Sequence, residues 1–167
     1  MIARLEGKIE LRGEKFCVVN VSGVGYKVFA GPETLEKLPQ KGGDVKLWTR
    51  LYIREDAQEL YGFLTPEELE FFETLIEVPG IGPKGGLGVL AIAPLATLKK
   101  AIASGDTSYL TRVSGIGRKT AEKIVLELKE KLAKSGISQD APELKEEADA
   151  LEALVSLGYS QKEARDA

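Results

Sequence analysis

Hydrophobic and polar positions alternate at short intervals through the first 63 residues of the chain. Isoleucine, valine and aromatic residues recur there, and such alternation between turns is typical of half-buried strands. Turn signals rich in glycine interrupt the pattern at residues 12–14, 22–25, 31–32 and 41–44. The pattern predicts roughly four or five short strands in a small barrel of the OB or SH3 kind, with a short helical insert that begins at Pro32.

The apolar period becomes helical at Thr65. The segment Thr65-Pro66-Glu67-Glu68 is a capping box with proline at the first helical position. Apolar residues then recur three and four positions apart, which predicts a series of helices. We expect one helix that Pro79 stops, one over 84–92, one closed by Gly105, a short one capped by Asp106, and one whose apolar stripe is Ala121, Ile124, Val125, Leu128 and Leu132.

Residues 135–142 are mostly polar and predict a flexible linker. One amphipathic helix, stopped by Gly158, and the start of another follow the linker. Such a piece cannot bury its apolar faces alone, so it either packs on something else or is the beginning of a truncated domain. The predicted fold class is α+β with several domains: a β-barrel over 1–64, an all-α domain over 65–134, the linker over 135–142, and part of a third, helical domain over 143–167.

Composition excludes several classes of function. The chain has 167 residues and no histidine, which excludes Ser-His-Asp and Cys-His catalysis and most zinc sites. The chain has one cysteine, Cys17, so neither an intrachain disulfide nor a multi-cysteine metal site is predicted. Cys17 lies beside two valines and is expected in the core. No apolar run is long enough to span a membrane, and the N-terminus lacks a signal-peptide core. We therefore expect a cytoplasmic protein without metal, cofactor or membrane partner.

Charge is unevenly distributed, although the formal net charge is only −3. Residues 79–134 carry ten lysine and arginine residues against four acidic ones, whereas residues 137–167 carry three against eight. A basic middle between neutral and acidic ends is compatible with phosphate binding by one module. A solvated helical face is the alternative, and charge alone leaves both interpretations open.

A repeated motif carries the functional prediction. Residues 78–84 (Val-Pro-Gly-Ile-Gly-Pro-Lys) and 113–119 (Val-Ser-Gly-Ile-Gly-Arg-Lys) share one pattern at a spacing of 35 residues. Glycines around one apolar residue allow a tight turn between helices, and the free N–H groups of the turn and the next helix form an anion site. Such a site binds a phosphate and reads no base edge. The predicted DNA-backbone contacts are Gly80, Ile81, Gly82, Lys84, Gly115, Ile116, Gly117, Arg118, Lys119 and Lys123.

Both hairpins are helix-hairpin-helix motifs, and the order of the pieces resembles the RuvA family, the Holliday-junction branch-migration subunits of bacteria. The resemblance covers the whole chain, with local signatures at residues 1–7, 23–26, 54–63, 80–84, 115–122 and 153–159. It implies an OB-like barrel, a tandem helix-hairpin-helix domain and a UBA-like third domain. It also implies a non-catalytic DNA-binding subunit that holds four-way junctions open and square for branch migration in recombination, DNA repair and the SOS response.

The resemblance implies partners and further site residues as well. The family forms fourfold-symmetric tetramers, and the sequence leaves a tetramer or a pair of stacked tetramers open. The hexameric RuvB ATPase docks on the third domain, whose matching residues are Leu154, Leu157, Gly158 and Tyr159; the RuvC resolvase is a further implied partner. Glu55 and Asp56 match the family's acidic pin, whose carboxylates repel the phosphates of the crossover. Without the family they would be an ordinary charged hairpin turn.

Three glycines depart from the family's pattern, and ATP chemistry is missing. Gly85, Gly86 and Gly88 lie in the helix after the first hairpin, where each costs roughly 0.5–1 kcal/mol relative to alanine. Close packing of that helix or a mobile first hairpin would explain them. Residues 117–120 lack the Gly-Lys order and the glycine-rich loop of a Walker A motif, so ATP hydrolysis must belong to a partner.

Two other functions are open at this point. In helix-hairpin-helix glycosylases the hairpin lysine forms a Schiff base, which would make Lys119 the nucleophile and Asp140 its partner; against this, the N-terminal third is β and iron–sulfur cysteines are missing. A protein-interaction scaffold is the second, opposed by the basic hairpins. Trp48 and Tyr52 fit a base-stacking platform or, more simply, core packing.

Overall fold

The computed structural model describes residues 1–134 of the 167-residue chain. Its strands are β1 (Arg4–Arg12), β2 (Phe16–Val21), β3 (Val24–Phe29), β4 (Asp44–Ile53) and β5 (Gln58–Phe63). Its helices are α1 (Pro32–Lys37), α2 (Pro66–Ile76), α3 (Pro83–Leu90), α4 (Leu95–Ser104), the 3-10 helix η1 (Leu110–Arg112) and α5 (Arg118–Lys134). Residues 1–129 form one compact unit, and of the second unit, 130–167, the structure describes only the end of α5.

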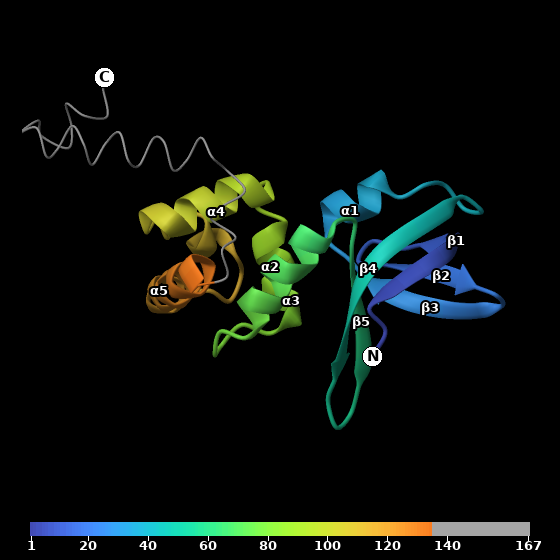
Figure 1. The fold of residues 1–167 in the computed structure, drawn as a ribbon, viewed down its shortest axis with the longest axis horizontal. Helices are drawn as coiled ribbons and strands as arrows, with labels where there is room; N and C mark the ends of the chain where they lie inside the picture. The colour runs from blue at the N-terminus through green and yellow to red at the C-terminus, as the bar shows by residue number, and fades with distance from the viewer. Residues whose placement is uncertain (135–167) are drawn as a thin grey trace, which may run out of the picture. The chain divides into compact units, whose positions relative to one another are not determined.

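The five strands form a closed barrel in the order β1-β2-β3-β5-β4, and β4 pairs back onto β1 (Figure 1). All neighbouring pairs are antiparallel except β3 and β5, which are parallel. Helix α1 begins at Pro32, as expected, and lies between β3 and β4 in the chain. A five-stranded barrel closed in this way is the OB-like fold that the sequence predicts.

Alternation along the strands fills the barrel. Side chains two positions apart point to the same face of a strand, so Leu5 and Ile9 of β1 both enter the core, where Leu47 of β4 and Val19 of β2 are their register partners. Leu35 and Leu38, at the end of α1, are buried in the same cluster. The barrel core is therefore built from positions that the sequence pattern marks as apolar.

Helix α2 begins with the predicted capping box. The Thr65 hydroxyl accepts the N–H of Glu68 over 3.2 Å, and the Glu68 carboxylate accepts the N–H of Thr65 over 3.4 Å. Proline follows at the first helical position, where its missing N–H costs nothing. Helix α4 ends, as expected, at Gly105, which has a left-handed φ of 80°.

Two helix predictions differ from the structure. The helix expected over 84–92 spans Pro83–Leu90, because proline fits its first turn and Ala91 already caps its end. Asp106 does not cap the short helix: its carboxylate accepts the N–H of Ser108 over 2.8 Å and closes a local turn. The short helix is a 3-10 turn, Leu110–Arg112, because the chain enters the second glycine turn directly after it.

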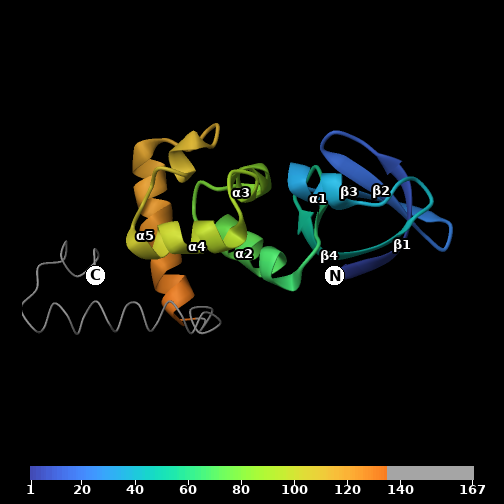
Figure 2. The same cartoon turned by 90° about the horizontal axis from the view of Figure 1, so that it is seen from above.

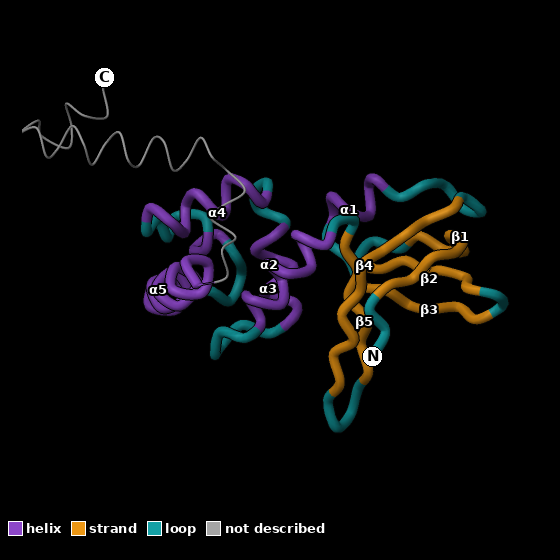
Figure 3. The backbone as a smooth tube through the Cα atoms, in the orientation of Figure 1, coloured by secondary structure: helices purple, strands orange, loops and turns teal. Residues whose placement is uncertain are grey.

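The barrel and α2 meet through aromatic rings and one ion pair. Phe72 of α2 packs against Phe63 and Tyr61 of β5, with ring centroids 4.8 and 5.4 Å apart. Arg50 of β4 donates to the Glu73 carboxylate of α2 over 3.1 Å. These contacts connect the strand-rich and helix-rich regions that Figure 3 distinguishes by colour.

Helix α5, seen along its length in Figure 2, is the longest of the described helices and carries the apolar stripe predicted for it. Ala121, Ile124, Val125 and Leu128 are buried, while the side chain of Leu132 lies outside the described residues. Among the described residues no single helix is long and apolar enough to cross a membrane; α3 and α4 reach that length only together, across a bend of 100°.

Candidate nucleic-acid interface

The two glycine turns have the same backbone geometry. In the first turn, N–H groups donate from Val78 to Leu75, from Ile81 to Val78 and from Gly86 to Gly82, over 3.0–3.1 Å. In the second, they donate from Val113 to Leu110, from Ile116 to Val113 and from Ala121 to Gly117, over 2.8–3.1 Å. Every bond recurs 35 residues later, so the sequence repeat is also a structural repeat.

The glycines of each turn have two different roles. Gly80 and Gly115 have φ values of 99° and 88°, a left-handed backbone that glycine adopts without strain. Gly82 and Gly117 lack a left-handed φ, and a Cβ atom added at either would meet nothing within 4 Å. The fold requires the first glycine of each pair, whereas the second leaves open space in front of the turn.

Buried apolar side chains anchor both turns in the core. Ile81 and Ile116, between the glycines, are both buried, as are Val78 and Val113 at the start of each turn. With the apolar residues inward, the turn and the first N–H groups of the following helix lie at the surface. These N–H groups have no intrahelical partner and carry the positive end of the helix dipole.

Lys84 and Lys119 occupy equivalent positions, two residues after the second glycine of each turn. Both are exposed, and neither α3 nor α5 has an acidic residue in its first turn. Within residues 1–134 neither lysine forms an ion pair. Each turn therefore combines free N–H groups, a helix N-terminus and one unpaired cation, which is suited to a phosphate.

The other two predicted basic contacts are paired within α5. Arg118 lies 3.1 Å from the Glu122 carboxylate, and Lys123 lies 3.7 Å from that of Glu127. Both pairs are solvent-exposed to a large extent, so they are weak and can exchange a carboxylate for a phosphate. The structure thus separates two free cations from two partnered ones, a distinction that the sequence did not make.

The glycines after the first hairpin are explained by close packing. A Cβ atom at Gly86 would lie 3.0 Å from ring atoms of Phe72 in α2, and one at Gly88 would lie 2.9 Å from Cγ1 of Val113. At Gly85 the nearest contact would be Cγ2 of Ile81 at 3.3 Å. Helix α3 therefore packs closely against both α2 and the second hairpin. Of the two explanations that the sequence left open for the glycines, these contacts support close packing of the helix.

Glu55 and Asp56 lie in the loop that joins β4 and β5, at the end of a hairpin that projects beyond the other strands (Figure 3). Both are exposed. The loop is closed by the N–H of Arg54, which donates to the carbonyl of Ala57 over 2.8 Å. The structure places both predicted pin residues together on an exposed tip that belongs to the barrel and not to the helix-hairpin-helix region.

Three residues beside this tip have no role that the sequence pattern predicts. The Arg54 guanidinium lies between the carboxylates of Asp56, at 4.0 Å, and Glu59, at 3.8 Å. The Tyr61 hydroxyl donates to Glu59 over 2.8 Å. Burial, followed by the hydrogen bond to Glu59, raises the pKa of Tyr61, so its hydroxyl remains a donor. A sequence signal existed, because Glu59 and Tyr61 are two positions apart in β5 and therefore lie on the same face of the strand.

Cys17 and Tyr52 have the core positions that the sequence predicts for them. Cys17 is fully buried in the barrel core, where burial raises the pKa of its thiol to about 11. Tyr52 packs against the aromatic cluster of Tyr61, Phe63 and Phe72, as the core-packing interpretation predicts. Trp48 is half-buried, and the Lys46 ammonium lies 5.6 Å from its ring.

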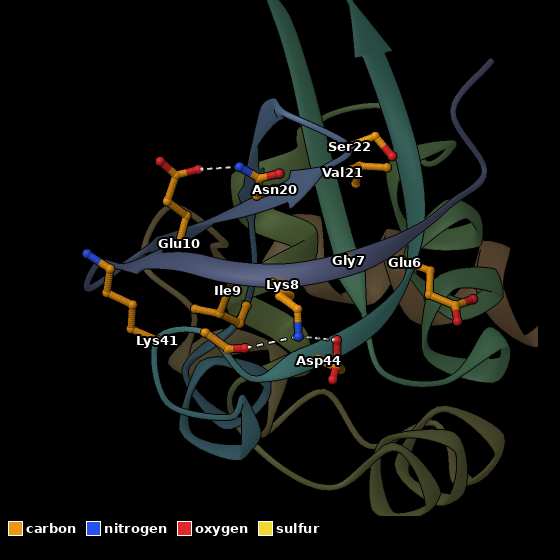
Figure 4. Close-up of a pocket in the computed structure, with 11 residues that line it drawn as sticks. Glu6, Gly7, Lys8, Ile9, Glu10, Asn20, Val21, Ser22, Lys41 and Asp44 are labelled. Atoms are coloured by element: carbon orange, nitrogen blue, oxygen red, sulfur yellow. Dashed lines mark hydrogen bonds and ion pairs between the residues drawn. The ribbon is translucent and has the colours of Figure 1, made fainter.

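A surface hollow on the barrel, drawn in Figure 4, contains none of the predicted site residues. Four of its polar side chains interact in pairs: Lys8 with Asp44 over 3.0 Å, and Asn20 with Glu10 over 3.2 Å. These groups do not converge on the hollow. No three His, Cys, Asp or Glu side chains among the described residues could hold a metal ion.

The predicted contacts of the third domain, Leu154, Leu157, Gly158 and Tyr159, lie outside the described residues, as do the linker and Asp140. The glycosylase interpretation needs Lys119 and Asp140 in one pocket. Lys119 is exposed on α5, and it lines neither the hollow of Figure 4 nor the one beside Pro32, Glu68 and Leu90.

Family models match three consecutive parts of the chain. The RuvA N-terminal domain matches residues 1–62, a SAM-like helix-hairpin-helix tandem matches residues 72–130, and the RuvA C-terminal domain matches residues 145–167. The first two matches correspond to the barrel and to the region that holds both glycine turns.

Curated relatives match over almost the whole chain. A protein of Caldanaerobacter subterraneus subsp. tengcongensis is 45% identical over 164 residues, which cover 98% of this chain and 87% of that protein. Proteins of Dehalococcoides mccartyi and of Neisseria meningitidis serogroup B are each 43% identical over 100% of this chain and 87% and 88% of their own lengths. All three are named Holliday junction branch migration complex subunit RuvA.

Proposed function

The chain belongs to the RuvA family, and from this we propose that it binds four-way DNA junctions and holds them open for branch migration. The duplicated glycine turn is the observation that carries the proposal. Two similar anion sites, each with a lysine that forms no ion pair within residues 1–134, can hold a DNA backbone at two neighbouring phosphates without reading its sequence. In this role the chain is a DNA-binding subunit and not a catalyst.

The exposed hairpin tip supports selectivity for junctions over ordinary duplex. Carboxylates are repelled by phosphates, so Glu55 and Asp56 would not bind a duplex arm. At a crossover, where four strands meet, the same repulsion opposes closure and favours strand separation. The two glycine turns would therefore supply affinity, and the acidic tip would act on the shape of the junction.

Assembly and partners follow from the same proposal. We propose a fourfold-symmetric tetramer with the barrels, residues 1–64, at the junction centre and the hairpin regions, residues 65–134, on the arms. A partner ATPase, RuvB, supplies the energy and docks through Leu154, Leu157, Gly158 and Tyr159 of a domain over 143–167, which follows a linker over 135–142. The RuvC resolvase is a further partner, and the complex acts in the cytoplasm.

A competition gel-shift assay tests the DNA-binding proposal. An immobile four-way junction and a linear duplex of equal length would be compared at two salt concentrations, with unlabelled duplex as competitor. We expect a strong preference for the junction and a steep loss of affinity with salt, because phosphate contacts release counterions. Equal and weak binding to both DNAs would contradict junction selectivity.

Charge-neutralising variants test the site itself. Lys84→Gln combined with Lys119→Gln should weaken junction binding and lower the salt slope by about one for each lysine. Lys37→Gln is the matched control, because Lys37 is an exposed lysine of α1, outside the glycine turns. An unchanged affinity of the double variant would contradict the assignment of the two turns.

A further inference from the structure

A contiguous set of contacts leads from the acidic tip into the protein. Arg54, the first residue after β4, lies with its Nε atom 4.0 Å from Asp56 and its Nη2 atom 3.8 Å from Glu59. The Glu59 oxygen on that side also accepts the Tyr61 hydroxyl, over 2.8 Å. One cation therefore connects a carboxylate of the tip with a carboxylate that is hydrogen-bonded to the core.

The two ends of this set differ in exposure. The Asp56 side chain is 82% exposed, whereas that of Glu59 is 18% exposed and Tyr61 is 1% exposed. A carboxylate withdrawn from water needs a cation and a hydrogen-bond donor beside it. Arg54 and Tyr61 supply these to Glu59, which makes Glu59 a fixed anchor for the Arg54 side chain.

Further contacts connect Tyr61 with the first glycine turn. Tyr61 packs on Phe72, with centroids 5.4 Å apart, and Phe72 contacts the α3 backbone at Gly86 so closely that a Cβ there would lie 3.0 Å from its ring. Helix α3 begins at the turn that carries Lys84. The acidic tip and the first hairpin are thus joined through consecutive side-chain contacts.

We propose that Arg54 and Glu59 form a brace that positions the acidic hairpin. The brace rests on the proposed function: it would hold the tip at a fixed angle to the barrel, so that its carboxylates face the crossover. The brace also makes the two carboxylates of the tip unequal. Arg54 offsets the charge of Asp56, whereas Glu55 forms no ion pair within residues 1–134. Glu55 is then the stronger source of repulsion.

A direct DNA contact is the competing role for Arg54, whose side chain is 50% exposed. The two roles predict opposite effects of Glu59. If Arg54 bound a phosphate, Glu59 would compete with that phosphate, and Glu59→Gln would strengthen binding. If Arg54 is part of a brace, Glu59→Gln and Arg54→Gln remove the same interaction and shift the tip in the same direction.

The experiment uses the full chain, with Arg54→Gln, Glu59→Gln, the double variant and Arg54→Lys. Lys8→Gln is the matched control, because Lys8 forms an exposed ion pair with Asp44 on the same barrel. A junction with 2-aminopurine beside the crossover reports base-pair opening at saturating protein. Hydrogen exchange of the Arg54 amide, which donates to Ala57, reports the order of the loop without DNA.

We expect both single variants to reduce the 2-aminopurine signal equally and the double variant to reduce it no further, since coupled residues are not additive. Arg54→Lys should keep part of the signal, because an ammonium group cannot face two carboxylates as a guanidinium does. Junction affinity and its salt slope should stay unchanged. Exchange of the Arg54 amide in Glu59→Gln should rise about threefold, within the range of a partly exposed ion pair.

Two results would overturn the brace. Glu59→Gln that strengthens binding, or a reduced salt slope in Arg54→Gln, would make Arg54 a phosphate contact. Unchanged amide exchange in Glu59→Gln would show that the loop is ordered without the pair. The exchange measurement needs no DNA, so its failure is distinct from a failure of the wild-type chain to prefer junctions, which would contradict the proposed function.

Discussion

Single positions in the glycine turns show how one residue type can serve two physical purposes. Gly80 and Gly115 are required by their left-handed backbone, which a side chain would strain. Gly82 and Gly117 are unstrained and face open space. Backbone conformation therefore explains the first glycine of each turn. Close approach of a phosphate, which belongs to the proposed function, would explain the second.

Replacing Gly80 or Gly82 by threonine separates these purposes. Gly80→Thr should destabilise the helix-hairpin-helix region by about 1–2 kcal/mol or more, because a β-branched residue disfavours a φ of 99°. Gly82→Thr should leave stability within about 0.5 kcal/mol, because threonine and glycine are similar helix N-caps. Urea unfolding followed by far-ultraviolet circular dichroism measures both.

Junction binding should then show the reverse order at matched folded concentration. Gly82→Thr places a side chain where a phosphate would approach the turn, so its affinity should fall about tenfold, equivalent to ~1.4 kcal/mol. Wild-type affinity of Gly82→Thr would show that no phosphate comes close to this residue.

At the scale of elements, helix α3 owes its position to glycines, which have no side chain and so allow close packing. Its eight residues include three glycines, a composition that weakens an isolated helix. Two of them allow close contacts, with the Phe72 ring of α2 and with Val113 of the second hairpin, where a Cβ atom would force the neighbour to move. Tertiary packing thus offsets a poor helix propensity and fixes one hairpin against the other.

Alanine scanning of α3 should reverse the usual rule for helices. Gly86→Ala and Gly88→Ala should each destabilise the protein by about 1–3 kcal/mol, because a Cβ at 3.0 or 2.9 Å forces buried neighbours to move. Gly85→Ala, whose closest contact would be 3.3 Å from one methyl group, is the control and should change stability least. Thermal unfolding of the three variants measures the changes in stability. A Gly86→Ala variant more stable than the wild type would contradict close packing of α3 against α2.

At the scale of the whole molecule, the described unit depends on contacts between barrel and helices. The aromatic cluster of Tyr61, Phe63 and Phe72 provides an apolar interface. Beside it, Arg50 and Glu73 form an ion pair whose side chains are only about one-third exposed, and the Arg50 Nε atom is buried with no partner among the described residues. An arginine held in this way depends on its single carboxylate.

Glu73→Gln should therefore lower the free energy of unfolding by about 1 kcal/mol, because it leaves the half-buried Arg50 charge without a counterion. Glu33→Gln is the matched control, since Glu33 pairs with Lys37 at an exposed helix surface and should matter little. Urea unfolding followed by the fluorescence of Trp48, the only tryptophan, measures the difference. Equal effects of the two variants would show that the barrel–helix pair is as weak as a surface pair.

Local spacing along the chain was enough to predict much of this protein. Strand alternation, the Thr65 capping box and the 35-residue repeat of the glycine turns depend on neighbours within a few positions, so the pattern itself contains the information. Asp106 was misassigned because a carboxylate can cap a helix or close a turn with its own backbone, and the two have similar sequence signals.

Only the tertiary structure decided which of several equivalent residues carry a role. Among the described residues Lys84 and Lys119 form no ion pair, while Arg118 and Lys123 do. Gly86 and Gly88 allow close packing, and Arg54 reaches both Asp56 and Glu59. These distinctions depend on distances between side chains of different elements and on burial. Periodicity fixes which face of an element is apolar, but the neighbour that a side chain meets is set by how the elements pack together.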